Sequence, residues 1–482
     1  MLANINKKVL SLFIIIVVIN GIFNATFQLH YDESYYWVWS QHLALSYFDH
    51  SPMIAYMIAL TTYFNHSEFF VRLPALITTS ITALTIFALA KRMFNARVAN
   101  IALLLAISWP MLEGNFFIVT PDCPLNMFWA LTLLAFYIGI FENKPRHIYL
   151  AGFFAGGALL SKYTAILIFP GLFLFLVFNP DMRQYLWRKE VYFAFIISLL
   201  VFTPVIIWNY QHHWVSLFFQ LKHGYDDIQH FRLSSFGDFL SAQIGVANPI
   251  IMLSLFYYLI RYHKIHLTNA KLAFLFWPFI FCMLFFTHSS FYTYVGANWT
   301  EPGIISGIII LAYWLDYFHN KWIYRSSLCL IMLAILMVKL PTIFLPAPLV
   351  KRIAAIRVFY ANRELVAQIK PMLHDDTVLL ACDYGNASRA WYYVNDTHLN
   401  TNQPGYHQVY VLNQFRYANA YQYWNHDLTM PIKHAIFVCD VNDAIDISIL
   451  KKYFANVQLL KTATVVTALH QKRIMYIFSA DN

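Results

Sequence analysis

The chain has 482 residues, of which 59% are hydrophobic and only 12% are charged. Soluble domains carry about 25% charged residues, so this composition excludes an ordinary soluble protein. The formal net charge is +9, but much of it lies in short loops between apolar segments, where it indicates membrane topology rather than a nucleic-acid partner.

Repeated apolar segments predict a polytopic α-helical membrane protein with about eleven or more transmembrane helices. Lys7 and Lys8 before the first segment resemble the start of a signal peptide. No clear small-residue cleavage site follows, so we expect an uncleaved first span. The apolar segments cover approximately residues 9–29, 71–90, 98–112, 124–141, 148–160, 165–179, 191–208, 238–260, 272–288, 302–319 and 327–346.

Lys and Arg are distributed unequally over alternate loops. One set of loops holds most of them, including Lys91, Arg92 and Arg97, whereas the other set holds few, including Arg72 and Lys162. By the positive-inside rule the first set faces the cytoplasm. The second set, with long loops rich in acids, histidines and aromatics, is therefore predicted to face the periplasm.

The composition changes after Pro346-Ala347-Pro348. Helical patterns such as Arg352 to Lys370 then alternate with short strand-like runs at 377–381, 409–412, 435–438, 457–460 and 474–478. An odd number of spans places this region on the outer face. We therefore predict a transmembrane domain over 1–348 and a periplasmic α/β domain over 349–482. Cys382 and Cys439 can pair in such a domain, and unpaired thiols are an equal alternative.

The first outer loop begins with Tyr31-Asp32-Glu33-Ser34-Tyr35-Tyr36-Trp37, directly after the first apolar segment. Carboxylates at a membrane boundary are costly unless they are solvated or paired, so Asp32 and Glu33 favour a catalytic role such as that of a general base. An acidic pair that only ends a helix is the alternative. The aromatic neighbours suit the level of the lipid headgroups.

Two further acids stand in the predicted outer loops. Asp49 and His50, within Tyr47-Phe48-Asp49-His50-Ser51-Pro52, can bind phosphate, a metal or a proton in transit, although such a pair is usually an ordinary loop. Asp122 lies between two prolines at the head of a membrane helix, where an acid interacts favourably with the helix N-terminus. An ordinary N-cap is the alternative explanation for Asp122.

Two cations lie on the same predicted side, against the positive-inside bias. They are Arg72, in Val71-Arg72-Leu73-Pro74, and Lys162, in Ser161-Lys162-Tyr163-Thr164. Such cations can neutralise a lipid phosphate, whereas snorkelling of the side chain to the interface is the alternative. Aromatic faces stack on sugar rings and cations hold phosphate groups, so the combination predicts sugar–phosphate chemistry.

Two aromatic stretches complete the outer loops. Trp208-Asn209-Tyr210-Gln211-His212-His213-Trp214, which continues to His223, is typical of an amphipathic helix at the membrane interface. Asn298-Trp299-Thr300-Glu301-Pro302 adds an aromatic, an amide and an acid at another predicted helix start.

These segments together resemble the GT-C glycosyltransferases of the family 39 type. That group includes protein O-mannosyltransferases and the lipid A aminoarabinose transferases of Gram-negative bacteria. The resemblance also takes in Asn386-Ala387-Ser388-Arg389-Ala390-Trp391-Tyr392-Tyr393 and Asn413-Gln414-Phe415-Arg416-Tyr417. It implies a GT-C fold in the inner membrane and transfer of a sugar from a polyprenyl-phosphate donor to lipid A or another envelope acceptor on the periplasmic face. It implies membrane lipids as surroundings and no nucleic acid.

The resemblance also implies roles for individual residues, with Asp32 as the catalytic carboxylate and Glu33 in support. His50 stands where aminoarabinose transferases have Lys, and Tyr35 where they often have Arg, which shifts phosphate binding onto the remaining cations. Some relatives hold a divalent metal between the first loop and a later His, for which Asp49 and His223 are the matching pair. No other cofactor is expected. The substrate-binding candidates are Asp49, His50, Arg72, Asp122, Lys162, Tyr163, Asn209 and Trp299.

A transporter or flippase of lipid-linked sugars is the alternative function. Transporters carry charges near the middle of the membrane and broken helices in related halves. This chain instead has its acids at one interface and no visible internal repeat. An envelope assembly protein with a membrane anchor is a third possibility, but an anchor needs no such set of polar residues. The pattern therefore favours an enzyme.

Overall fold

The computed structural model describes the following residues: 5–224, 231–245, 248–339, 359, 361–374, 377–395, 409–411, 419–424, 432–440, 447–466 and 472–482. Contacts within the chain divide it into two compact units. Unit 1 comprises Met1–Ile22, Leu45–Ile54 and Leu73–Ile335, and unit 2 comprises Phe23–Ala44, Ala55–Arg72 and Leu336–Asn482. Unit 2 therefore groups much of the predicted first outer loop with the C-terminal region. The predicted domain boundary between residues 348 and 349 lies outside the described residues and stays a prediction.

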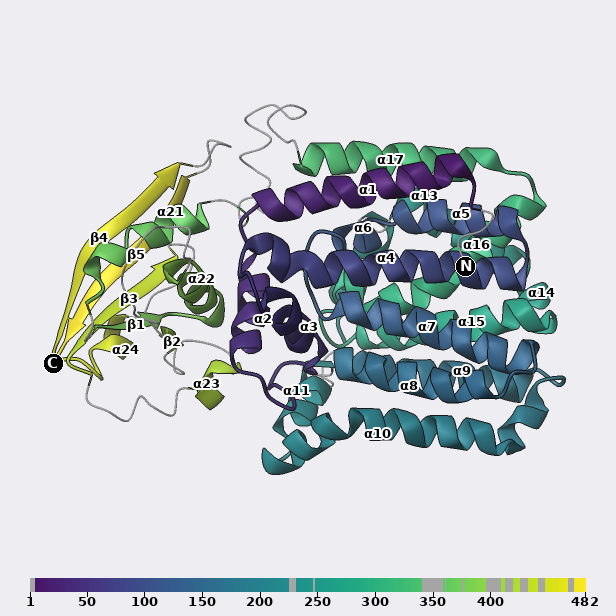
Figure 1. Ribbon diagram of the computed structural model, residues 1–482, viewed down its shortest axis with the longest axis horizontal. Helices are drawn as coiled ribbons and strands as arrows, with labels where there is room; N and C mark the ends of the chain where they lie inside the picture. Colours follow the sequence, from purple (N-terminus) through teal and green to yellow (C-terminus); the bar gives the residue numbers. More distant parts are fainter. Residues whose placement is uncertain are drawn as a thin grey trace. The chain divides into compact units, whose positions relative to one another are not determined.

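Unit 1 is a bundle of helices (Figure 1). Three of its helices, α1, α4 and α17, also include residues that belong to unit 2. Its α-helices and 3-10 helices (η) are α1 Lys7–Thr26, α4 Glu68–Met93, α5 Ala96–Ile107, α6 Pro110–Gly114, α7 Asp122–Phe141, α8 Arg146–Ser161, η1 Tyr163–Leu167, α9 Ile168–Phe178, η2 Arg183–Trp187, α10 Lys189–Gln211, α11 Val215–Gly224, α12 Leu233–Gly245, α13 Pro249–Arg261, α14 His263–Thr268, α15 Ala270–Ser289, η3 Ala297–Thr300, α16 Glu301–Tyr317 and α17 Lys321–Lys339.

Small residues allow α8 to approach its neighbours closely. A Cβ added at Gly152 would collide with the carbonyl oxygen of Ala194, and one at Gly156 would collide with Val201, both on α10. Small residues four apart allow membrane helices to pack backbone against backbone. Figure 1 shows α7, α8 and α10 side by side. The glycines of α8 allow this close packing, and Lys162 directly follows the last residue of α8.

Five described helices, α1, α4, α7, α10 and α15, are long and apolar enough to cross a membrane, and the bent pair α12 and α13 would make a sixth. The predicted count of about eleven spans is therefore not confirmed. Helices do occupy the described parts of the other predicted ranges, but α5, α8 and α16 have only 12, 16 and 17 residues. A span requires about 20.

Unit 2 contains a five-stranded sheet with the strand order β2-β1-β3-β5-β4. Strand β1 runs parallel to β2 and β3, whereas β5 runs antiparallel to β3 and β4. The elements are α2 Tyr31–Gln41, α3 Met53–Thr62, α21 Asn362–Ala367, η4 Lys370–Met372, β1 Thr377–Ala381, α22 Tyr384–Val394, β2 Val409–Val411, α23 Tyr421–Trp424, β3 His434–Asp440, α24 Ile447–Leu450, β4 Asn456–Val466 and β5 Lys472–Asp481. The predicted strand ranges are all occupied, apart from Leu412, which lies outside the described residues.

Two other C-terminal predictions meet the same limit. Of the helical pattern predicted from Arg352 to Lys370, residues 352–358 and 360 lie outside the described part, and α21 lies within the described remainder. The segment Asn413 to Tyr417 lies outside it as well.

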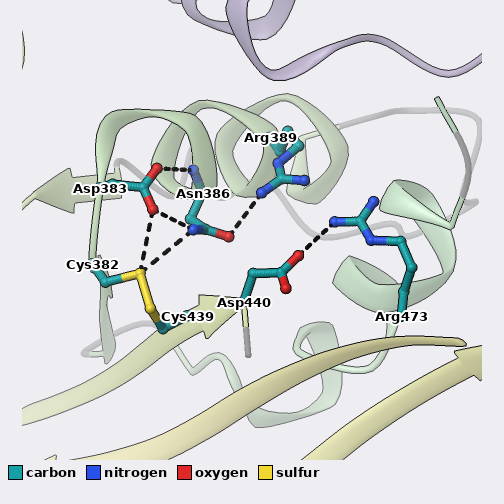
Figure 2. The surroundings of a disulfide bond; sticks show 7 residues. All are labelled: Cys382, Asp383, Asn386, Arg389, Cys439, Asp440 and Arg473. Carbon is teal, nitrogen blue, oxygen red and sulfur yellow. Dashed lines mark hydrogen bonds and ion pairs between the residues drawn. A yellow bond between two sulfur atoms is a disulfide. The ribbon is translucent and has the colours of Figure 1, made fainter. Parts of the chain in front are cut away.

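A disulfide between Cys382 and Cys439 joins the end of β1 to β3, with the two Cα atoms 5.4 Å apart (Figure 2). Of the two alternatives for these cysteines, the paired one is present. The bond lies beside a core that includes Leu380, Phe437 and Phe478. It therefore ties together two central strands at the point where α22 begins.

Candidate active site

The start of α2 is held by a reciprocal pair of capping bonds. His30 Nδ1 accepts from the Asp32 N–H at 3.2 Å, and Glu33 Oε2 accepts from the His30 N–H at 2.8 Å. These bonds satisfy N–H groups that a helix start otherwise leaves unpaired. The backbone that carries both predicted catalytic carboxylates is thereby fixed.

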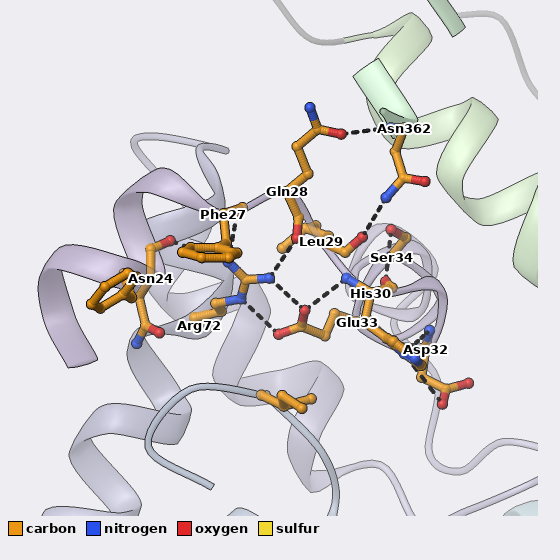
Figure 3. A network of polar contacts seen from close by, with 12 residues as sticks. Asn24, Phe27, Gln28, Leu29, His30, Asp32, Glu33, Ser34, Arg72 and Asn362 are labelled. Carbon is orange, nitrogen blue, oxygen red and sulfur yellow. Dashed lines mark hydrogen bonds and ion pairs between the residues drawn. The ribbon is translucent and has the colours of Figure 1, made fainter. Parts of the chain in front are cut away.

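Glu33 forms a buried two-point ion pair with Arg72 (Figure 3). Arg72 Nε donates to Oε1 at 2.8 Å and Nη2 donates to Oε2 at 2.7 Å, and both side chains are fully buried. The remaining N–H groups of Arg72 donate to the carbonyl oxygens of Asn24, Phe27 and Gln28. A guanidinium has five N–H groups, and here each has an acceptor. This geometry gives the pair a structural role and leaves Arg72 no donor for a phosphate.

Asp32 lies on the same turn but in different surroundings. Its side chain is 34% exposed. Its Oδ1 accepts a hydrogen bond from the Tyr384 hydroxyl at 3.0 Å, and its Oδ2 lies 3.6 Å from His30 Nδ1. Burial raises the pKa of Asp32 to about 6, against the lowering effect of the Tyr384 bond and with a smaller rise from the charge of Glu33. A carboxylate of this kind can give up and regain a proton near neutral pH.

The aromatic residues of α2 are buried within unit 2. Tyr35 and Trp37 are 4% and 3% exposed. The Tyr35 ring lies 4.6 Å from that of Tyr384, and Trp37 packs edge-on against Tyr392 at 5.0 Å. These rings therefore pack inside the protein, where they form the contact between α2 and α22. Their level relative to the lipid headgroups stays a prediction.

A second polar cluster lies in unit 1, at the ends of α7, α8 and η3. Lys162 Nζ donates to Asp122 Oδ1 at 2.8 Å, and Asn298 Nδ2 donates to Asp122 Oδ2 at 2.7 Å. Asp122 makes no side-chain cap to its own helix, and Lys162 is only 7% exposed. Neither an ordinary N-cap nor a snorkelling lysine describes these residues. The contacts also bring three of the predicted outer loops to one end of the bundle.

Glu301 adds another carboxylate to this end of unit 1. It is 2% exposed, and Asn115 Nδ2 donates to both of its oxygens at 3.0 Å. Trp299, one of the predicted binding residues, lies in η3 just before it and packs against Phe286 with ring centroids 5.9 Å apart. The short stretch from η3 to the start of α16 thus contains the amide of Asn298, the indole of Trp299 and the acid of Glu301.

Tyr163 and Asn209 belong to an adjoining network. The hydroxyl groups of Tyr163 and Ser216 lie 2.8 Å apart, and Asn209 Nδ2 donates to the Tyr163 oxygen at 3.3 Å. Asn209 is fully buried and its Oδ1 also accepts from the Leu217 N–H. Asn209 therefore fixes the turn between α10 and α11, and Tyr163 is the member of this pair nearer to Lys162 in the chain.

The proposed metal ligands are only partly described. Asp49 and His50 are half-buried, and Gln220 on α11 donates to the Asp49 carbonyl oxygen. The side chain of His223, on the same helix, lies outside the described part of the structure. No group of three His, Cys, Asp or Glu side chains within the described residues could hold a metal ion. The described donors do not make up a metal centre, so Asp49 with His223 stays a prediction.

The residues of these clusters that were not predicted as site residues include Asn298, Glu301 and Tyr384. Asn298 and Glu301 lie in a stretch that the sequence analysis identifies as polar at a predicted helix start, so the sequence did indicate them. The sequence did not indicate Tyr384, because it lies 352 positions from Asp32 and its role depends on how α22 packs.

Comparison with known proteins finds similarity to membrane glycosyltransferases. Residues 49–208 match the family described as dolichyl-phosphate-mannose-protein mannosyltransferase. The chain is 28% identical over 337 residues to the lipid A galacturonosyltransferase RgtD of Rhizobium johnstonii, with 67% of each protein covered. The chain carries a GT-C glycosyltransferase domain. The resemblance predicted from the sequence is confirmed, and with it the assignment as a membrane glycosyltransferase.

Solved structures agree in fold. ArnT from Cupriavidus metallidurans in the apo state aligns with a TM-score of 0.64 at 15% identity, covering 97% of each chain. The same protein bound to undecaprenyl phosphate aligns with a TM-score of 0.65 at 14% identity, covering 98% of each. The archaeal oligosaccharyltransferase AglB from Archaeoglobus fulgidus aligns with a TM-score of 0.52 at 10% identity, covering 96% of this chain and 74% of that one. The chain therefore has an ArnT-like GT-C fold.

Proposed function

We propose that this glycosyltransferase moves a sugar from a polyprenyl-phosphate donor to lipid A or another envelope glycolipid on the periplasmic face of the inner membrane. RgtD acts on lipid A by its name, and ArnT has been solved with undecaprenyl phosphate, which supports this choice of acceptor and donor. The observation that carries the proposal is the Asp32 carboxylate, half-exposed and held by one oxygen.

Asp32 acts as the general base. Its Oδ2 takes the proton of an acceptor hydroxyl while the hydroxyl oxygen attacks the anomeric carbon of the donor. The bond between that carbon and the phosphate oxygen breaks, and its electron pair leaves with the polyprenyl phosphate. Attack from the face opposite the phosphate inverts the anomeric centre. With its pKa raised to about 6, Asp32 is mostly ionised at pH 7 yet is still basic enough to share the proton in the transition state.

Lys162 holds the donor phosphate. An ammonium has three N–H groups, and within the described residues Lys162 uses one of them, toward Asp122 Oδ1. The other two are available to phosphate oxygens, whose charge grows as the sugar leaves. Arg72 is assigned to the fold instead, because its donors are satisfied by Glu33 and by backbone carbonyls.

An apolar cavity in unit 1 suits the isoprenoid tail of the donor. It measures about 430 Å³ and lies among α7, α8, α9 and α10, with Phe136, Leu172, Leu176, Val191 and Phe195 in its wall. Burial of a hydrocarbon tail there contributes binding free energy without any polar partner.

The disulfide supports the periplasmic location. Disulfides persist in oxidising compartments such as the periplasm and are rare in the cytoplasm. Cys382 of the disulfide lies two residues before Tyr384, whose hydroxyl donates to Asp32. The proposed base and the disulfide thus belong to one unit and are exposed to one side of the membrane.

The test is mass spectrometry of envelope lipids, lipid A above all, from cells that carry equal amounts of the wild type, Asp32→Asn or Asp481→Asn. Asp481 is a control in the same unit, where its 41% exposed side chain pairs with His434. General-base catalysis contributes about 10²- to 10⁴-fold, so we expect Asp32→Asn to abolish a sugar adduct that the other two strains contain. The mass of the adduct identifies the sugar.

Full transfer by Asp32→Asn would refute the assignment of Asp32 while leaving the family intact. An adduct on protein or polysaccharide, with lipids unchanged in all strains, would refute lipid A as the acceptor.

A further inference from the structure

We propose that Tyr384, the first residue of α22, is a positioning residue for the Asp32 carboxylate, so that the C-terminal region completes the active site. This inference rests on the proposed role of Asp32 as the catalytic base. Tyr384 and Asp32 both lie outside residues 49–208, which match the family. The inference about this pair therefore rests on the contacts of this chain and not on the family match.

The contact is specific in direction as well as distance. The Tyr384 hydroxyl donates to Asp32 Oδ1 at 3.0 Å. Its ring packs between two rings of α2, with centroids 4.6 Å from Tyr35 and 6.3 Å from Tyr31. Aromatic packing of this kind restricts the ring to one orientation. The hydroxyl therefore stays directed at the carboxylate.

The backbone that carries Tyr384 is equally fixed. Asp383 caps α22, with Oδ1 accepting from the Asn386 N–H at 2.9 Å, and its other oxygen accepts from the Asn386 side-chain amide (Figure 2). Cys382, one residue earlier, is bonded to Cys439 of β3. A helix cap and a covalent bond to the sheet thus hold the residues next to Tyr384, so the hydroxyl has a rigid support.

This arrangement gives the two oxygens of Asp32 different roles. His30 Nδ1, 3.6 Å from Oδ2, accepts from the Asp32 N–H and so has no proton to donate to that oxygen. Burial lowers the pKa of His30 to about 4, so the ring is neutral near pH 7. Within the described residues, Tyr384 is the only side chain that donates to the Asp32 carboxylate. Oδ1 is thereby occupied and Oδ2 is left for the hydroxyl of the acceptor.

The hydroxyl also sets the range of pH in which Asp32 is a base. A hydrogen bond to the ionised carboxylate favours the ionised form, so its loss raises the pKa of Asp32 above about 6. Within the described residues, His30, Tyr31 and Glu33 at the start of α2 face Asp32, and Asp383 and Arg389 of the segment that forms α22 interact electrostatically with Tyr31 as well. None of them changes when Tyr384 is replaced by Phe, which keeps the ring and removes only the hydroxyl.

An infrared titration of the purified full-length protein tests the contact without any ligand. The carboxyl signal that is present in the wild type and absent in Asp32→Asn isolates Asp32. We expect Tyr384→Phe to move its midpoint up by about one pH unit. Tyr392→Phe is the matched control, because the Tyr392 hydroxyl, on the same helix, donates to the His66 carbonyl oxygen instead. It leaves the midpoint in place. An unchanged midpoint in Tyr384→Phe would overturn the inference.

Transfer of the sugar to lipid A, measured at two pH values, tests the role in catalysis. A midpoint near 7 in place of 6 leaves about a tenth of Asp32 ionised at pH 6 instead of half, so Tyr384→Phe should transfer about fivefold more slowly at pH 6 and nearly normally at pH 8.5. An equal loss at both pH values would show a merely structural role and contradict the inference. Full activity of Asp32→Asn would instead refute the proposed function, and the infrared result would still stand.

Discussion

Two buried ion pairs in this chain have almost the same contact distance and very different surroundings. Arg72 lies 2.7 Å from Glu33 in unit 2, and Lys162 lies 2.8 Å from Asp122 in unit 1. Every N–H group of the Arg72 guanidinium donates a hydrogen bond, either to Glu33 or to a backbone carbonyl oxygen. The ammonium has one acceptor within the described residues. A cation whose donors are all satisfied by protein stabilises the fold, whereas one with donors to spare can bind a ligand.

The largest effect on stability should come from breaking the Arg72–Glu33 pair. Arg72→Met leaves Glu33 charged and buried without its partner, and such a change costs about 3–5 kcal/mol of unfolding free energy. Unfolding of the purified protein in detergent measures it. Arg92→Met is the control, because Arg92 pairs with Glu142 in unit 1, where the two side chains are 44% and 25% exposed. We expect it to cost less than about 1 kcal/mol.

A double variant sharpens this prediction. Glu33→Gln together with Arg72→Met removes both charges and should restore part of the lost stability, because the penalty comes from the unpaired carboxylate. If Arg72→Met unfolded like the wild type but no longer transferred sugar, Arg72 would be a ligand-binding cation and the contrast between the two pairs would fail.

Breaking the Lys162–Asp122 pair should affect the rate of sugar transfer more than the stability of the fold. Lys162→Met removes a donor to the phosphate and should lower the rate of transfer by about 100-fold, with a smaller loss of stability than Arg72→Met because Asn298 still donates to Asp122. Lys144→Met is the control, since its ammonium also lies 2.8 Å from a carboxylate, that of Glu142, but is 54% exposed. A Lys162→Met protein that is unstable and yet fully active would contradict the assignment.

The same contrast shows what the sequence could not reveal. Arg72 and Lys162 have the same charge and fall in the same set of loops, so both were predicted to bind phosphate. Three of the acceptors that saturate Arg72 are backbone carbonyls, which carry no residue identity. No pattern of side chains could have distinguished the two cations.

Other parts of the fold were easier to predict because their signals are local. The strand ranges follow from short apolar runs, and the helices long enough to span a membrane, α1, α4, α7, α10 and α15, follow from long ones. The number of spans is not confirmed, because an apolar run marks a helix without fixing its length. Asp32 was predictable from its place beside the first span, whereas Tyr384 was not, since a contact across 352 positions depends on tertiary packing.

The smallest effect extends the comparison to Asp32, the acid that neither pair includes. Its pKa in the folded protein, about 6, lies above the ordinary value of 3.8. Between these values the folded state binds more protons than the unfolded state, so the contribution of Asp32 lowers stability as the pH rises. Asn carries no charge and keeps an oxygen for the Tyr384 hydroxyl. Asp32→Asn should therefore be more stable than the wild type at pH 8, by about 1 kcal/mol after allowance for its exposure to solvent.

The pH dependence separates this effect from a general change in packing. The difference in unfolding free energy between Asp32→Asn and the wild type should shrink as the pH falls toward 4.5, where the folded protein holds Asp32 protonated. A difference in unfolding free energy that is the same at every pH would show that ionisation of Asp32 does not destabilise the folded protein. If Asp32→Asn gains stability at pH 8 and loses sugar transfer completely, the Asp32 carboxylate destabilises the fold and is kept for catalysis. Glu33, next to it on α2, differs because its charge is paired with Arg72.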